Sequence, residues 1–164
     1  MGRRALTIAF LCAFACSSQP GGPYHYHLVV STDFTDAQSQ AIVDAATEWQ
    51  LQSLGYVDFD GQPGPDANIT ITVADPTTLA AEFGGGALGV DQTTGRTSHI
   101  QILQSLDPVT FHQTALHELG HALGLVHMTP GNIMCANTVC ATLEVTCGDL
   151  GQLLHRTVTT NCTP

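Results

Sequence analysis

Residues 117–127 of the chain read HELGHALGLVH, which places three histidines and one glutamate within a single short span. Histidines four apart on a helix lie on the same side, about 6 Å apart along the axis, so His117 and His121 can bind one metal ion. Glu118 lies beside them on the same exposed edge. An ordinary composition would produce this extended pattern by chance in only about one chain in 10⁵. The stretch therefore predicts a helix that carries a metal site.

The third histidine lies six residues after the second, too far along a straight helix to share the ion. Gly124 can end the helix, because glycine adopts a positive φ without a Cβ clash, and His127 can then turn back toward the metal. Three imidazoles leave one position of a tetrahedral zinc ion open, and zinc lowers the pKa of a water bound there to about 7. Glu118 is the expected general base, which passes that proton to the leaving amine. The predicted reaction is zinc-dependent hydrolysis of peptide bonds.

The same string, followed by Met134 in GNIMCA, resembles the signature of the metzincin superfamily of zinc peptidases. The resemblance implies that Met134 forms a hydrophobic floor beneath the metal and is not a ligand. It also implies that substrate binds as an extended strand along a sheet edge, expected here near residues 87–90. Met128 follows the third histidine and no tyrosine follows Met134, so the subfamily stays open, with some likeness to the matrixins. Only His99 stands where matrix metalloproteinases hold a second, structural zinc, so we expect one zinc ion.

Strand and helix patterns lie on both sides of the motif. Alternating apolar residues predict strands, and apolar residues at helical spacing behind capping residues predict helices. The expected strands are 24–31, 56–59, 67–74, 87–90 and 99–103, and the expected helices are 35–54, 107–123 and 149–156. Together with the resemblance, they predict an α+β, metzincin-like fold: a twisted mixed sheet packed on two long helices, with a small disulfide-stapled C-terminal part.

The start of the chain has the pattern of an export signal. Arg3 and Arg4 precede an apolar run that ends at Ala15 and is too short to span a bilayer. We expect a signal peptide over 1–15, a flexible tether over 16–23 and a metallopeptidase domain over 24–164. Cys16 follows a small-x-small site that loosely resembles a bacterial lipobox. The mature protein is therefore expected outside the cytoplasm, either freely secreted or anchored as a lipoprotein through Cys16, facing the cell exterior or the periplasm.

The charge balance excludes one class of partner. The sequence contains no lysine, and only Arg96 and Arg156 follow residue 15, against fourteen carboxylates in all. Nucleic-acid binding needs clustered cations and is not expected. The expected partner is a polypeptide substrate, and the expected state is a monomer.

Several other polar residues invite a metal-site interpretation. Asp58, Asp60 and Asp66 flank a glycine-rich loop that could hold calcium, although solvated turn carboxylates are the interpretation we favour. The remaining histidines, His25, His27, His112 and His155, are interpreted as surface or strand residues.

Four cysteines lie in the last 30 residues of the chain: Cys135, Cys140, Cys147 and Cys162. Export exposes thiols to oxidising conditions, so two disulfides are expected, with all three pairings open. A different class of function also stays open, a non-catalytic zinc-containing binding module at the cell surface. Glu118 speaks against that module, because a purely structural zinc needs a fourth protein ligand and no base.

Overall fold

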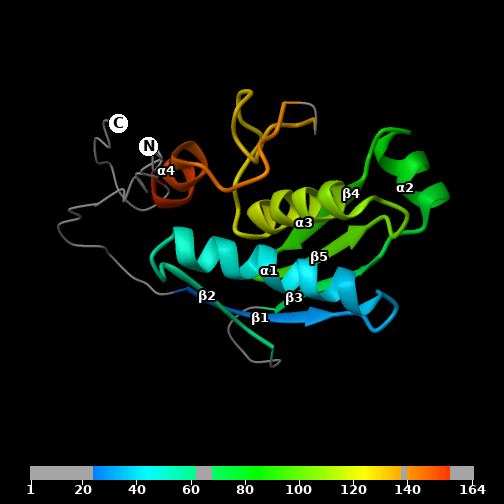
Figure 1. Ribbon diagram of the computed structural model, residues 1–164, viewed down its shortest axis with the longest axis horizontal. Coiled ribbons are helices and arrows are strands. Elements are labelled where there is room, and N and C mark those ends of the chain that lie inside the picture. Colours follow the sequence, from blue (N-terminus) through cyan, green and yellow to red (C-terminus); the bar gives the residue numbers. More distant parts are fainter. Residues whose placement is uncertain (1–23, 62–67, 138–139, 156–164) are drawn as a thin grey trace, which may run out of the picture.

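The computed structural model describes residues 24–61, 68–137 and 140–155 (Figure 1). Several sequence-based expectations lie outside these residues: the export signal 1–15, the tether 16–23 with Cys16, and the residues Asp66, Arg156 and Cys162.

A five-stranded mixed sheet forms one layer of the fold, as predicted. Its strands are β1 (Tyr24–Val30), β2 (Val57–Asp60), β3 (Asn68–Val73), β4 (Gly89–Thr94) and β5 (Thr97–Ile102). The strand order is β2-β1-β3-β5-β4, and only the pair of β4 and β5 is antiparallel. The expected edge strand is therefore real, although β4 begins at Gly89 and runs to Thr94 rather than covering 87–90.

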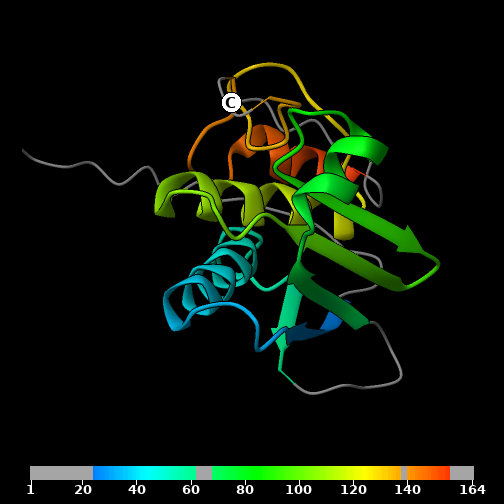
Figure 2. The same cartoon turned by 90° about the vertical axis from the view of Figure 1, so that its right-hand side faces the viewer.

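Two long helices, α1 (Asp36–Gln52) and α3 (Pro108–Ala122), cover one face of the sheet (Figures 1 and 2). Alternate residues of the central strands point toward these helices, so the buried isoleucines of β3 and β5 pack against Trp49, Phe111 and Leu116. The indole Nε1–H of Trp49 donates a hydrogen bond to the carbonyl oxygen of Leu116 at 3.0 Å. This buried bond fixes α1 against the helix that carries the histidines.

Short polar side chains determine where the long helices begin. Thr35 caps α1 in a reciprocal capping box with Gln38. Asp107 caps α3 and accepts hydrogen bonds from the backbone N–H groups of Val109 and Thr110, with Pro108 at the first helical position. The Thr110 hydroxyl and backbone N–H hold the pKa of the Asp107 carboxyl below its usual value.

A third helix, α2 (Pro76–Phe83), was not predicted from the sequence. Its start carries the same signal as α3, because Asp75 accepts a hydrogen bond from the backbone N–H of Thr78 at 2.7 Å and Pro76 follows it. The helix ends at Gly84, whose φ of 94° lies in the left-handed region. Gly84, the first of three successive glycines, is the C-cap of this short helix.

The C-terminal part contains α4 (Cys147–His155), which begins two residues before the expected position. One disulfide joins Cys135 and Cys140, which confirms one of the two expected disulfides. The other expected disulfide involves Cys162, which lies outside the described residues. Within the described part of the chain, no helix combines the length and the apolar character that a membrane span requires.

Candidate metal centre

The end of α3 reverses the chain just after the second histidine of the motif. Gly124 has a φ of 87°, and its N–H donates to the carbonyl oxygen of His121 at 2.7 Å. The N–H of Leu125 donates to the carbonyl oxygen of Gly120 at 2.9 Å, which completes a Schellman motif. The turn at Gly124 therefore directs residues 125–127 back along the helix.

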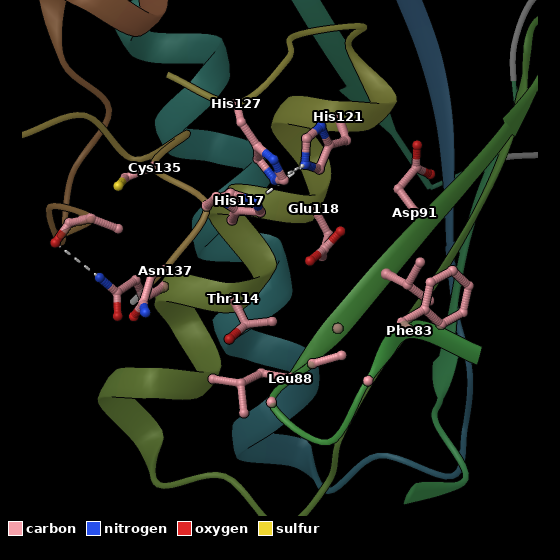
Figure 3. Close-up of a pocket in the computed structure, with 18 of the residues that line it drawn as sticks. Phe83, Leu88, Asp91, Thr114, His117, Glu118, His121, His127, Cys135 and Asn137 are labelled. Carbon is pink, nitrogen blue, oxygen red and sulfur yellow. Dashed lines mark hydrogen bonds between the residues drawn. The ribbon is translucent and has the colours of Figure 1, made fainter. Parts of the chain in front are cut away.

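The three imidazoles of His117, His121 and His127 point toward one another above α3 (Figure 3). Their ligand atoms lie within 4.8 Å of one another. The Nε2 atom of His121 lies 3.1 Å from that of His117 and 3.2 Å from that of His127. Two Nε2 atoms bound to one tetrahedral zinc ion at about 2.0–2.1 Å would be separated by about 3.3–3.4 Å. The spacing of the nitrogens thus fits a zinc ion.

Backbone carbonyls fix the protonation of two of these rings. The Nδ1–H of His117 donates to the carbonyl oxygen of Ile133 at 2.8 Å, and that of His121 donates to the carbonyl oxygen of Leu125 at 2.9 Å. A carbonyl oxygen only accepts, so the proton lies on Nδ1 and the Nε2 lone pairs face the centre. Facing lone pairs repel unless a cation lies between them. The tautomers therefore also fit a metal ion.

Desolvation favours the neutral form of His117 and of His127. Desolvation lowers the pKa of His117 to about 4, assisted by the neighbouring His121 and His127 and opposed by the bond to Ile133 and by Asp149. Desolvation is also the main cause that lowers the pKa of His127, and the neighbouring His121 adds to it. Neutral imidazoles are the form that binds a metal.

Glu118 is buried beside this cluster and faces the edge strand β4. Desolvation and the negative charge of Asp91 raise the pKa of its carboxyl to about 8, while a hydrogen bond from the backbone N–H of Asp91 opposes the shift. In the absence of a nearby cation, Glu118 therefore holds a proton at neutral pH. A divalent ion on the histidines would favour its ionised form.

Met134 is fully buried beneath the histidine helix. Its side chain packs so closely on Gly120 that a Cβ at position 120 would collide with the Met134 sulfur, and it would come within 3.1 Å of the Trp49 ring. Met134 therefore packs against the helix that carries His117 and His121.

Asp149 holds the turn at Ile133 and Met134 in place. This role was not predicted from the sequence. Its carboxylate is fully buried and accepts the backbone N–H groups of Ile133 and Met134, each at 3.1 Å. It also caps α4 reciprocally with Thr146. The peptide group between Ile133 and Met134 thus bonds Asp149 through its N–H and His117 through its carbonyl. The spacing Thr146-x-x-Asp149 resembles a capping box and was the available signal.

A cleft of about 720 Å³ runs between α3 and β4 and includes the histidines and Glu118. The residues Cys135, Ala136 and Asn137 form the opposite wall. Gln113 of α3 binds the segment that follows this wall. Its Nε2 donates to the carbonyl oxygens of Ala141 and Thr142 at 3.2 and 2.9 Å. Residues Gly89, Val90, Asp91 and Thr93 of β4 line the cleft, which therefore follows the edge strand.

The other polar residues considered from the sequence lie elsewhere. His25 pairs with Asp58 at 3.0 Å and His27 pairs with Asp60 at 2.5 Å, both across neighbouring strands. The Nε2 of His99 lies 3.0 Å from the Thr72 hydroxyl, and His112 lies 3.7 Å from Glu48. We compared the spacing of His, Cys, Asp and Glu side chains across residues 24–61, 68–137 and 140–155. Within these ranges, His117, His121 and His127 are the one group of three or more that could hold a metal ion.

Comparison with known proteins gives a matching family model and similar solved structures. A family model described as matrixin matches residues 18–149. The structure of archaemetzincin from Methanopyrus kandleri is similar at a TM-score of 0.55 and 18% identity, over 80% of this chain and 93% of that chain. High choriolytic enzyme 1, a hatching enzyme zinc-protease from Oryzias latipes (medaka fish), gives a TM-score of 0.45 and 16% identity. That match covers 62% of this chain and 44% of that chain. None of the curated proteins matches this sequence.

Proposed function

The chain belongs to the matrixin family of zinc metalloendopeptidases, and from this premise we propose that it hydrolyses internal peptide bonds of polypeptides. We assign zinc binding to the Nε2 atoms of His117, His121 and His127. The main supporting observation is that these three nitrogens converge at a spacing that fits zinc. Backbone carbonyls also hold the proton of His117 and of His121 on Nδ1. One coordination position then stays open for chemistry.

When bound, zinc supplies a Lewis acid that polarises the scissile carbonyl and makes water more acidic. The Glu118 carboxylate takes a proton from the attacking water and delivers it to the leaving nitrogen. Its position beside the histidines in the lining of the cleft supports this role. Met134 supports the ligand helix from below through its contact with Gly120.

The substrate is proposed to lie in the cleft as an extended chain along β4. This strand is the edge of the sheet, so its outer backbone groups are available for pairing with a peptide. Gly89 lets the strand approach α3 closely, since a Cβ there would come within 2.8 Å of Thr114 and 3.0 Å of Glu118. The close approach brings the peptide backbone near the proposed base.

We retain the export pathway and the domain boundaries as proposals. The mature chain begins at or near residue 16 after signal removal and acts outside the cytoplasm as a monomer, either secreted or anchored through Cys16. Cys147 and Cys162 are the remaining candidates for the second disulfide once Cys135 and Cys140 are joined. The mass of the mature N-terminus distinguishes a lipidated Cys16 from a free one.

Cleavage of casein and of quenched fluorogenic peptides by the purified, zinc-loaded protein tests the proposed activity. We expect Glu118→Gln to lower kcat/KM about 10²–10⁴-fold while the protein still binds one zinc ion. The exposed Glu144→Gln is the matched control and should keep wild-type activity. Full activity of Glu118→Gln would refute the assigned base. A zinc-loaded wild type that cleaves nothing would favour the non-catalytic binding module.

A further inference from the structure

A second cavity, of about 370 Å³, adjoins the substrate cleft at the end of β4. Thr93 lines both cavities, so the two adjoin near the end of β4. Its other walls come from the turn between β4 and β5, the last residues around the end of α3, and Tyr24 at the start of β1. An extended chain that follows β4 past the histidines would reach this cavity.

Arg96 lines the second cavity and carries an unusual charge for this molecule. It is the single lysine or arginine within the described ranges, and the chain as a whole has a net charge of −10. No ion pair within 4 Å joins Arg96 to a carboxylate of those ranges. The nearby Asp91 instead accepts hydrogen bonds from the hydroxyls of Thr93 and Ser98. The guanidinium is therefore available to a ligand.

We propose that Arg96 forms a subsite for a carboxylate side chain of the substrate. The inference rests on the proposed peptidase function, because it takes the cleft along β4 to be the substrate site. A guanidinium binds a carboxylate with two parallel N–H donors, which gives both charge and orientation. The hydroxyl-bearing walls of Thr93, Thr97 and Ser98 tolerate a polar ligand. The substrate class is a polypeptide with Asp or Glu at one defined position.

The strand spacing predicts which position that is. Gly89, Asp91 and Glu118 line the same cleft, and Gly89 lies against the Glu118 side chain, so the scissile bond should lie opposite this part of β4. Thr94 ends the strand three residues later, which corresponds to about 10 Å of extended chain. Arg96 follows in the turn and has a long side chain. The acidic residue is therefore expected three or four residues from the scissile bond, on one side only.

The acidic character of the rest of the protein sharpens this preference. A substrate with many carboxylates is repelled by the overall field, whereas a single carboxylate opposite Arg96 gains a local attraction. We therefore expect a preference for one acidic residue in register and no preference for acidic peptides in general.

Equilibrium binding tests the subsite without requiring turnover. Zinc-loaded Glu118→Ala protein would be titrated into fluorescent peptides that carry Glu or Gln at each of the positions three and four residues on either side of the cleavage site. On one side, we expect the Glu peptide to bind about three- to tenfold more tightly than its Gln counterpart, with the ratio shrinking in 0.5 M salt. On the opposite side, the same exchange should leave affinity unchanged.

Two variants in the same background assign the effect to Arg96. Arg96→Gln should bring the ratio of the two affinities to about 1, and Arg96→Lys should keep part of the preference. A ratio near 1 in the parent protein, a ratio that survives Arg96→Gln, or no binding by any peptide would overturn the subsite. An Arg96-dependent preference in a protein whose wild type cleaves no peptide would support the subsite and refute the proposed activity.

Discussion

A glycine within the histidine motif determines how closely α3 can approach the side chains of Met134 and Trp49. Gly120 lies between the two helical ligands and contacts Met134 and Trp49, with no room for a Cβ. The metal-binding spacing of the motif does not require glycine at this position. The requirement comes from the packing of three segments that are distant in sequence, so only the structure reveals it.

Gly120→Ala is therefore expected to destabilise the protein by about 1–3 kcal/mol, because Met134 or α3 must move to accommodate the methyl group. Urea unfolding measures the change, and zinc titration should show weaker binding in the folded variant. Gly61→Ala is the control, since a Cβ there meets no atom within 4 Å and should leave both quantities unchanged. A fully stable Gly120→Ala protein would contradict the packing.

The protonation of His117 predicts a pH dependence for the metal-free protein. Its pKa is about 4 in the folded state against an ordinary value of 6.5, so the unfolded chain takes up a proton first as the pH falls. The stability should be complete above pH 6.5 and decrease between pH 6.5 and 4, by on the order of 3 kcal/mol from this group. Urea unfolding across this range measures the effect. In His117→Asn, the loss of stability between pH 6.5 and 4 should be smaller by that amount. An equal loss in the variant and the wild type would refute the assignment.

Helix α4 supports the site although it carries none of the proposed ligands. Its Asp149 holds the turn at Ile133 and Met134, while Gln152 accepts the backbone N–H of Val126 at 2.7 Å, next to His127. The helix therefore supports two of the three histidines through backbone groups. The sequence predicted this helix but gave no indication of its role, because the bonds join segments that only tertiary folding brings together.

Asp149→Asn tests this support. The carboxylate accepts the backbone N–H groups of Ile133, Met134 and Thr146. The amide would turn its own N–H groups toward at least one of them, leaving a buried N–H without an acceptor, at a cost of about 1–3 kcal/mol. We also expect zinc affinity to fall about 10–100-fold, because the carbonyl partner of His117 shifts. Asp44→Asn, on the exposed face of α1, is the control with the same loss of charge. Unchanged zinc affinity in Asp149→Asn would contradict the supporting role.

The elements also show where local patterns suffice. Helices α1 and α3 were predictable because capping residues and apolar spacing agree along each segment. Helix α2 was not predicted from the sequence, although its capping signal at Asp75 and Pro76 is as clear as that of α3.

At the scale of the whole molecule, the sequence predicted an α+β fold with a mixed sheet on two long helices, and the matrixin family and the fold confirm it. The strand order and the pairs His25–Asp58 and His27–Asp60 were not predictable, since they follow from which strands become neighbours. The histidines were predictable because their spacing is local. The turn at Gly124 was also predictable, because glycine commonly ends a helix. The hydrogen-bond partners of the histidines were not predictable.

The central claim is that three imidazoles, two from α3 and one from beyond its final turn, bind one zinc ion. Diffraction from crystals of the zinc-loaded protein, recorded at the zinc absorption edge, tests it most directly. We predict one anomalous peak in the cleft, about 2.0–2.1 Å from the Nε2 atoms of His117, His121 and His127. A peak bound by other residues, or His127 turned away from the ion, would contradict the account.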